Sequence, residues 1–276
     1  MIFFKDLQWS SNKLIYNNYV FRLEHFKDIK WEHDDSYFTF YKVKGLVDEY
    51  ENFFSKAGDF KCTNLLEIGV FKGGSMPFWN ELLGPEKHIG VDLIEITSTA
   101  YLDNYLNEKR KSGKAINYYG KIDQSDKNKL LSICSSEFKE PLDLVIDDAS
   151  HLYDPTKASF EAMFPLLRPG GLYIIEDWAW GHWEEFFLAD NFWANEVPPT
   201  KLITELIEFV GTDRNRNIVR SLAVYEGFVV LERGDFQIAS DEFELEKFIK
   251  RRPVHPKPSP ILRKVKRLAK KVLGRK

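Results

Sequence analysis

The stretch Leu65-Leu66-Glu67-Ile68-Gly69-Val70-Phe71-Lys72-Gly73-Gly74-Ser75 predicts a buried strand, a glycine turn and the start of a helix. Gly69 and Gly73 allow the backbone to approach a ligand closely, and the first helical turn supplies unpaired N–H groups. Asp92 follows the next predicted strand, 23 residues after Gly69, where an acid in an α/β sheet can accept both hydroxyls of a ribose. The spacing is not that of a dinucleotide site, and no Walker lysine is present. For the glycines alone, an ordinary strand-to-helix loop is the alternative.

Short apolar runs alternate with longer helical stretches on both sides of this turn. Such alternation predicts a parallel sheet covered by helices on both faces. Two later runs joined by Glu226-Gly227 predict an antiparallel hairpin. The fold class is therefore α/β, with a Rossmann-like, doubly wound, mostly parallel seven-stranded sheet and a terminal antiparallel hairpin. The predicted strands are 64–69, 88–93, 116–119, 142–146, 172–175, 219–225 and 228–233, and the predicted helices are 47–56, 75–83, 101–111, 127–132, 156–167, 201–210 and 235–250.

The composition of the 276 residues, 43% hydrophobic and 29% charged, is that of a soluble globular protein. No apolar run approaches 18 residues, so no membrane span is expected. At the N-terminus, Asp6 comes too early for a signal peptide. Cys62 and Cys134 cannot form a disulfide framework. A reducing, cytoplasmic location is therefore expected.

Charge is distributed unevenly along the chain. Residues 250–276 hold twelve Lys or Arg and no acid, which leaves 27 basic and 42 acidic residues in the first 249. An acidic body disfavours nucleic-acid binding over a broad face. From Ile261 onward, apolar residues occupy an arc of roughly 140° on a helix and cations the other side. This basic amphipathic tail predicts binding to an anionic membrane surface, with a solvated tail, docking onto the acidic body, or nucleic-acid binding as alternatives.

Two neighbouring predicted strands end in acidic residues. Asp147 and Asp148 end one strand, and Glu176 and Asp177 end the next. Adjacent strands lie about 4.8 Å apart, so four carboxylates would crowd and repel one another at one edge of the sheet. A divalent cation is the natural neutraliser, and oxygen ligands favour Mg²⁺ or Mn²⁺ over Zn²⁺. For any single acid, helix capping is the alternative.

His151 lies three residues after Asp148 at the same edge. An ordinary imidazole titrates near pH 6.5, which suits a general base, and packing at a helix start is the alternative role. His182 is a second, lower-ranked candidate base. It lies in an insert, residues 178–193, that holds seven aromatic side chains. These are predicted to contact a sugar ring or keep water from the site, unless they serve packing or an oligomer contact.

Glu-x-Gly-x-x-x-Gly-Gly-Ser at residues 67–75, followed by Gly-Val-Asp at 90–92, resembles the class I S-adenosylmethionine-dependent methyltransferases. The resemblance covers residues 45–235. It implies that the glycine turn backs the methionine part of the cofactor, that Asp92 takes the ribose, and that the segment after the third strand contacts the adenine. The cofactor-binding residues are then Glu67, Gly69, Gly73, Ser75, Asp92, Asp123, Gln124 and Asp147.

Residues 146–151, 160–171 and 175–177 resemble a narrower group, the metal-dependent sugar O-methyltransferases of macrolide pathways and the related cephalosporin-hydroxylase-like family. This resemblance implies Mg²⁺ (or Mn²⁺) ligation by Asp148, Glu176 and Asp177, with His151 as the base. The 2-His-1-carboxylate set of oxygenases is not evident. We therefore expect methyl transfer from S-adenosylmethionine to a hydroxyl of a sugar or glycan, with Asp148 and His151 as the catalytic residues. A nicotinamide-dependent oxidoreductase and a non-catalytic membrane-associated scaffold are the alternatives.

The expected domain organisation has four parts. Residues 1–45 form an N-terminal extension, 46–250 the methyltransferase domain, 251–260 a proline-rich linker, and 261–276 the tail helix. A small-molecule or lipid-linked glycan is the expected acceptor, and the tail would attach the enzyme peripherally to the inner face of the membrane. An oligomer remains open.

Overall fold

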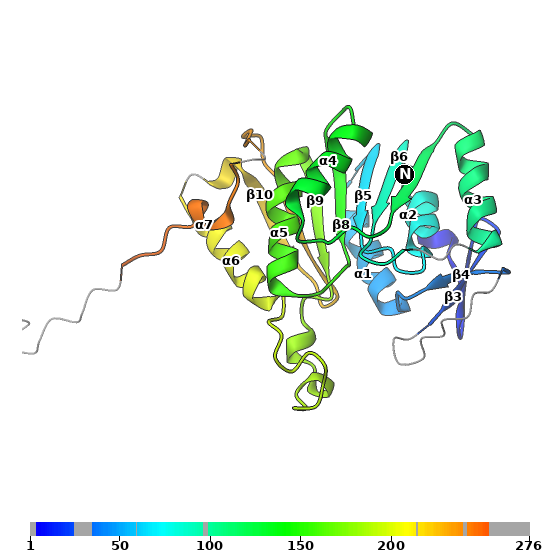
Figure 1. The fold of residues 1–276 in the computed structure, drawn as a ribbon, viewed down its shortest axis with the longest axis horizontal. Coiled ribbons are helices and arrows are strands. Elements are labelled where there is room, and N and C mark those ends of the chain that lie inside the picture. The colour runs from blue at the N-terminus through cyan, green and yellow to red at the C-terminus, as the bar shows by residue number, and fades with distance from the viewer. Residues whose placement is uncertain are drawn as a thin grey trace, which may run out of the picture.

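The computed structural model describes residues 4–24, 35–58, 60–95, 99–213, 215–239 and 242–253. Within these ranges the core is a seven-stranded sheet in the order β10-β11-β9-β8-β5-β6-β7 (Figure 1). The strands from β9 to β7 pair in parallel, and β11 pairs antiparallel with both β9 and β10. This confirms the predicted fold class. The strands are β5 (Asn64–Ile68), β6 (Lys87–Val91), β7 (Ala115–Tyr119), β8 (Leu142–Asp147), β9 (Leu167–Glu176), β10 (Val219–Val224) and β11 (Phe228–Arg233).

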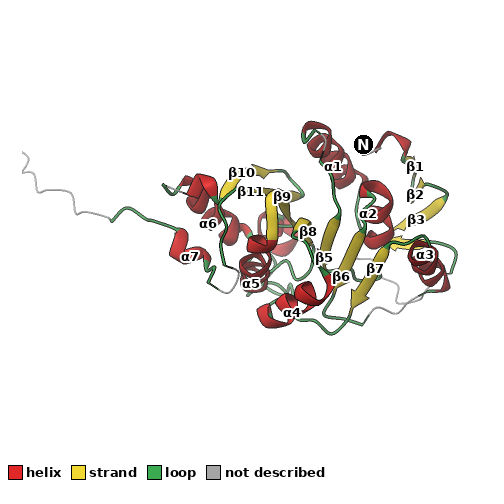
Figure 2. Cartoon of the chain, turned by 90° about the horizontal axis from the view of Figure 1, so that it is seen from above, coloured by secondary structure: helices red, strands yellow, loops and turns green. Residues whose placement is uncertain are grey.

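Helices cover both faces of the sheet, as Figure 2 shows. The two faces have separate apolar clusters because successive side chains of a strand point to opposite sides. Leu66 and Ile68 of β5 pack in one cluster, and Leu65 packs in the other. This double burial explains why the strand sequences are continuous apolar runs. The first cluster includes α4 (Lys127–Glu137), α5 (Tyr153–Met163), α6 (Thr200–Gly211) and α7 (Leu245–Phe248), and the second includes α1 (Lys44–Lys56), α2 (Ser75–Leu83) and α3 (Ala100–Lys111).

The N-terminal residues form a small second sheet, which the sequence did not predict. Its order is β1-β2-β3-β4, with β3 and β4 parallel. Phe21 packs against Phe40, and both contact Phe78 of α2 at ring-centroid distances of 6.1 and 4.8 Å. The segment therefore shares a core with the main sheet. Its strands are too short to show a period: β1 (Gln8–Ser10), β2 (Lys13–Tyr16), β3 (Tyr19–Leu23) and β4 (Phe38–Phe40).

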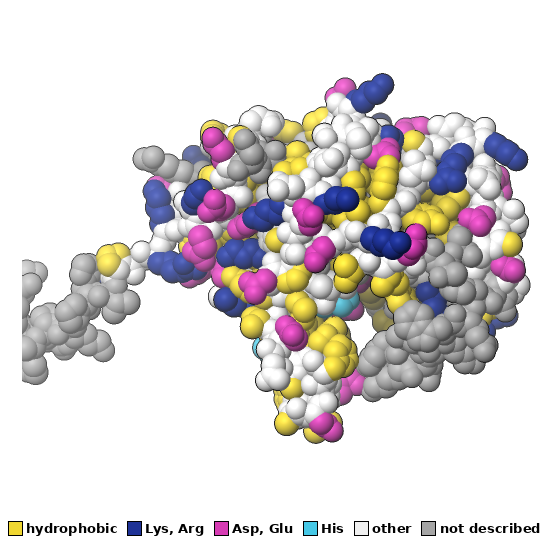
Figure 3. All heavy atoms as spheres, viewed as in Figure 1, with side chains coloured by type: hydrophobic (Ala, Val, Ile, Leu, Met, Phe, Trp, Pro, Cys, Tyr) yellow, Lys and Arg dark blue, Asp and Glu magenta, His cyan; other side chains and the backbone are white. Residues whose placement is uncertain are grey.

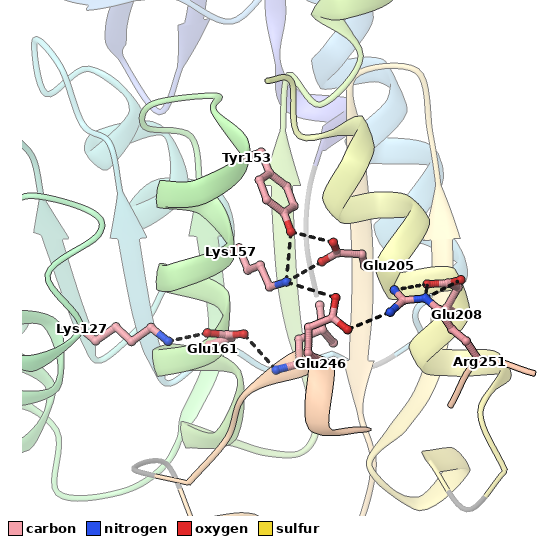
Figure 4. A network of polar contacts seen from close by, with 9 residues as sticks. Lys127, Tyr153, Lys157, Glu161, Glu205, Glu208, Glu246 and Arg251 are labelled. Carbon is pink, nitrogen blue, oxygen red and sulfur yellow. Dashed lines mark hydrogen bonds and ion pairs between the residues drawn. The ribbon is translucent and has the colours of Figure 1, made fainter. Parts of the chain in front are cut away.

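The C-terminal part of the body differs from the predicted helix over 235–250. Within the residues described there, α7 covers only Leu245–Phe248. Side chains fix this segment instead (Figure 4). Arg251 binds Glu208 of α6 at 2.6 Å and Glu246 at 2.8 Å, and Lys157 of α5 binds Glu205 at 2.7 Å. Most of the predicted linker, from residue 254, and the whole predicted tail helix lie outside the described residues.

Short 3-10 turns complete the connections between these elements. They are η1 (Phe4–Asp6), η3 (Phe164–Leu166), η4 (Trp180–His182), η5 (Glu184–Phe186) and η6 (Asn215–Asn217). In the part of the chain that the structure describes, we find no helix with the length and apolar character that a bilayer crossing requires.

Candidate active site

The glycine turn lies at the carboxyl edge of the sheet, between the ends of β5 and β8. Gly69 has φ +90°, and a Cβ atom there would lie 2.1 Å from the carbonyl oxygen of Asp148. The Asp148 N–H donates to the carbonyl of Ile68 at 2.8 Å. Glycine is therefore required at position 69 by both conformation and contact. The turn is joined directly to the acidic end of β8.

Asp92 holds the shape of this turn. Its Oδ2 accepts the N–H groups of Val70 and Phe71 at 2.8 and 2.7 Å, and its Oδ1 accepts the N–H of Ile94 at 2.9 Å. The predicted ribose acceptor thus also satisfies backbone donors at the start of the turn. Because each carboxylate oxygen has two lone pairs, the half-exposed group retains acceptor capacity for a ligand.

Asp148, His151 and Asp177 come together at the ends of β8 and β9. One donor atom from each lies within 4.8 Å of the others. His151 and Asp177 have φ values of +53° and +49°, a conformation that non-glycine residues rarely adopt. Such strain is typical of functional sites. The His151 Nε2 lies 3.8 Å from Asp148 Oδ1. Two carboxylates and an imidazole in this arrangement fit a divalent ion.

Glu176, the third ligand implied by resemblance, has a different environment. Its side chain is 1% exposed, and its oxygens accept from Lys42 Nζ at 2.7 and 2.6 Å and from the Tyr50 hydroxyl at 2.7 Å. Lys42 Nζ also binds Asp148 Oδ2 at 2.8 Å. A lysine from the N-terminal segment therefore neutralises the acidic edge. The sequence analysis missed Lys42 because nothing in its local pattern separates it from a surface lysine.

The pKa shifts follow from this burial and charge. Burial alone would lower the pKa of Lys42, but attraction to Asp148 and Glu176 outweighs it and raises that pKa, so the ammonium stays charged. Burial, followed by the charge of Asp148, raises the pKa of Glu176, and Lys42 opposes that shift. Burial also raises the pKa of Asp177. The acidic edge therefore contains several groups with shifted pKa values, and such shifts are common at catalytic sites.

Three predicted cofactor-binding side chains are instead engaged in the interior. Asp147 is 2% exposed and accepts from Gln124, Ser159 and Tyr173 at 2.5, 2.5 and 2.8 Å. Burial raises its pKa to about 6, although these hydrogen bonds oppose the shift. Glu67 is fully buried beside His88, 3.1 Å away. In the described structure the side chains of Asp147, Gln124 and Glu67 are thus occupied by partners within the protein, and their contacts with a cofactor stay predictions.

The remaining predicted cofactor residues, Asp123, Gly73 and Ser75, differ in exposure: Asp123 is exposed, Ser75 half-buried and Gly73 buried. Asp123 is exposed after β7, where its Oδ1 accepts from the backbone and hydroxyl of Ser125, and these bonds lower its pKa. Gly73 has φ +78° and its N–H donates to Val70 at 2.6 Å. Ser75 is the first residue of α2 and is half-buried. Their contacts with a cofactor stay predictions.

The aromatic insert projects from the body of the chain (Figure 1), and two of its side chains contact His151. Trp180 Nε1 donates to the His151 carbonyl at 2.6 Å, and the Trp193 ring lies 6.2 Å from the imidazole. Farther out, Phe187 and Phe192 are 65% and 77% exposed, and Figure 3 shows hydrophobic side chains on this projection. His182 is exposed on the same segment. The inner aromatics thus support the His151 backbone, while the outer ones remain free for a ligand.

The sheet order, the glycine turn and the acidic edge define a Rossmann-like methyltransferase fold. Residues 66–178 match the family described as a methyltransferase domain. Demethylmacrocin O-methyltransferase from Streptomyces fradiae is 33% identical over 189 residues, covering 62% of this chain and 44% of that protein. Mycinamicin VI 2''-O-methyltransferase from Micromonospora griseorubida is 33% identical over 129 residues, covering 44% and 29%.

A solved methyltransferase structure also resembles this chain. The MycE methyltransferase from the mycinamycin biosynthetic pathway, in complex with Mg, SAH and mycinamycin VI, aligns with a TM-score of 0.52 and 27% identity. The alignment covers 74% of this chain and 52% of MycE. The chain thus spans less than half the length of these curated relatives and about half of the MycE chain.

Proposed function

We propose that this protein transfers a methyl group from S-adenosylmethionine to a hydroxyl of a sugar or glycan, assisted by Mg²⁺ or Mn²⁺. The observation that carries the proposal is the junction of Gly69 and Asp148, which joins the glycine turn to the acidic edge. A cofactor on that turn and an acceptor at that edge would be neighbours. The macrolide sugar O-methyltransferases among the relatives, and MycE with Mg and SAH, support the same reading.

The chain's own residues divide the work. The glycine turn and Asp92 bind the cofactor, Asp148 and Asp177 hold the ion, and His151 removes the acceptor proton. S-adenosylmethionine would supply an electrophilic methyl group, and the ion would lower the pKa of the acceptor hydroxyl. The aromatic insert orients the acceptor and excludes water, which supplies the alignment needed for in-line displacement. Residues 46–250 are proposed to form the domain that carries these functions, with Lys42 reaching its acidic edge from the preceding segment.

Binding and turnover measurements test the proposal. Isothermal titration with S-adenosylhomocysteine, with and without Mg²⁺, should show binding, whereas NAD⁺ should not bind. Methyl transfer to demethylmacrocin and mycinamicin VI as probe acceptors should stop with a chelator and return with Mg²⁺ or Mn²⁺. His151→Asn should lose transfer while keeping S-adenosylhomocysteine affinity. Binding of NAD⁺ with no binding of S-adenosylhomocysteine would instead support an oxidoreductase.

We further propose that residues 261–276 bind an anionic membrane surface and bring the enzyme to a lipid-linked acceptor. The support is their sequence, in which apolar and basic residues would lie on opposite sides of a helix. Several cations near an anionic leaflet contribute about 1 kcal/mol each. Cosedimentation with phosphatidylserine vesicles at low and high salt tests this, and absence of binding at low salt would exclude it.

A further inference from the structure

We propose that Lys42 is a built-in counter-ion that competes with a divalent ion for the acidic edge, so that Glu176 serves Lys42 and the ion is held by Asp148 and Asp177. The inference rests on the proposed function for the identity of the site. It differs from the ligand set implied by resemblance, in which Glu176 is a third metal ligand. It makes Lys42 a positioning residue that sets how tightly the ion binds.

The contacts of Lys42 carry the inference. Its ammonium has three protons, and three acceptor atoms lie within 2.8 Å of the nitrogen: Asp148 Oδ2 and both oxygens of Glu176. Lys42 is 3% exposed, so these contacts are sheltered from water. The ammonium therefore occupies the space between the two carboxylates that a shared metal ion would need.

Lys42 is also held in place by the elements on either side of it. It follows β4, whose Thr39 carbonyl lies so close to Gly74, the N-cap residue of α2, that a Cβ atom on Gly74 would be 1.8 Å from the oxygen. It precedes α1, where Tyr50 stacks on Phe228 of β11 at 4.1 Å and donates to Glu176. Both elements are anchored in the core, which fixes the backbone position from which Lys42 reaches the acidic edge.

The other half of the acidic edge remains available to an ion. Asp148 Oδ1 faces His151 rather than Lys42, and Asp148 and Asp177 both belong to the cluster whose donor atoms lie within 4.8 Å. Asp148 is 23% exposed, so water reaches this half. Mg²⁺ commonly binds through one or two carboxylates and keeps several waters. Asp148 and Asp177 therefore suffice, and His151 stays free to act as a base.

Formal charge supports this division. Asp148, Glu176 and Asp177 carry three negative charges, and Lys42 reduces the sum to two, which one divalent ion balances. Removing the ammonium would end its repulsion of the ion and leave Asp148 Oδ2 without this competing partner. Metal affinity should therefore rise when Lys42 is replaced by an uncharged residue. If Lys42 instead supported metal binding, the same replacement would lower the affinity.

Mn²⁺ affinity, measured by electron paramagnetic resonance of the free ion, tests the proposal on the full-length protein. Lys42→Met should bind Mn²⁺ at least tenfold more tightly than the wild type. The matched control Lys44→Met alters an exposed lysine two residues away, which contacts Asp48 and the Trp9 ring, and should leave the affinity unchanged. Unchanged or weaker Mn²⁺ binding by Lys42→Met would overturn the proposal.

Two further comparisons keep the test decisive if Lys42→Met does not fold. Asp177→Asn should bind Mn²⁺ at least tenfold more weakly than the wild type. Glu176→Gln should also bind Mn²⁺ more weakly, because it leaves the charge of Lys42 facing only two carboxylates. The double variant Lys42→Met/Glu176→Gln removes both members of the buried pair and should return to wild-type affinity within threefold. If Lys42→Met/Glu176→Gln binds Mn²⁺ as weakly as Asp177→Asn, Glu176 is a ligand and the inference is wrong.

S-adenosylhomocysteine titration of the same samples separates this inference from the proposed function. If the wild type does not bind S-adenosylhomocysteine, the methyltransferase proposal fails, while the Mn²⁺ series still judges Lys42. If S-adenosylhomocysteine binds and the Mn²⁺ series shows the opposite order, only the role of Lys42 is refuted.

Discussion

Replacing Asp92 should affect both the stability of the glycine turn and the binding of the cofactor. Its carboxylate accepts the N–H groups of Val70 and Phe71 within 2.8 Å, and neither donor would retain this partner in Asp92→Ala. Hydrogen bonds to charged groups contribute about 1.5–3 kcal/mol each, which gives an upper range of about 3–6 kcal/mol for two. Because the site is half-exposed, water offsets part of this loss. We expect a decrease of about 3 kcal/mol in the free energy of unfolding.

Asp92→Asn separates the two roles. The amide oxygen can still accept from the turn, so the stability loss should be only about 1 kcal/mol. Affinity for S-adenosylhomocysteine should nevertheless fall, because the proposed ribose acceptor would lose its charge. Urea unfolding and isothermal titration give the two quantities. Asp126→Ala, which removes the cap of α4 through Lys129 N, is the control that should cost about 1 kcal/mol with no change in cofactor affinity.

Two results would refute this reasoning. If Asp92→Ala unfolds at the same urea concentration as the wild type, the bonds to Val70 and Phe71 do not stabilise the turn. If both Asp92 variants keep full cofactor affinity, Asp92 acts only on the backbone and a different group must take the ribose.

Three further predictions concern other parts of the chain. Gly69→Ala should lower the free energy of unfolding by at least about 3 kcal/mol and abolish cofactor binding. The control Gly113→Ala has a similar φ of +92° but no neighbour within 4 Å, so it should cost only about 1 kcal/mol. Equal losses in the two variants would exclude a steric effect of the Asp148 contact. Burial raises the pKa of Cys134 to about 12 and also raises that of Cys62, so both thiols should react with Ellman's reagent at pH 8 only after unfolding; rapid labelling of the native protein would contradict their burial. Deletion of residues 254–276 leaves Arg251 and its partners intact and should change the free energy of unfolding by less than about 0.5 kcal/mol while abolishing vesicle binding; a large stability loss would show that the tail docks onto the body.

The sequence predicted the central sheet well because each of its strands is buried on both faces. Such strands read as apolar runs, and the predicted strand 64–69 and helix 75–83 nearly coincide with β5 and α2. The N-terminal sheet was not predicted because its strands have three to five residues, too few to show alternation. The helix over 235–250 was overestimated because ion pairs such as Arg251 with Glu208 fix that segment instead.

For the site, the sequence predicted which strand ends meet but not the environment of each side chain. Strand ends correctly brought Asp148, His151 and Asp177 to one edge, since parallel strands place their carboxyl ends together. Sequence reasoning could not tell which carboxylates turn inward. Asp147 is buried among Gln124, Ser159 and Tyr173, and Glu176 faces Lys42. These partners come from segments 12 to 134 residues away, so no local spacing reveals them.

The N-terminal segment therefore belongs to the site and is more than an extension of the catalytic domain. Tyr41 lies 4.9 Å from the ring of Phe71 in the glycine turn, and the next residue, Lys42, binds the acidic edge. One dipeptide thus contacts both the region proposed for the cofactor and the region proposed for the ion. Because β4 is fixed against α2 through Thr39 and Gly74, a shift of this strand would reach both regions together. Substitutions in β4 should therefore change cofactor and metal affinity jointly, whereas those in the aromatic insert should alter acceptor binding alone.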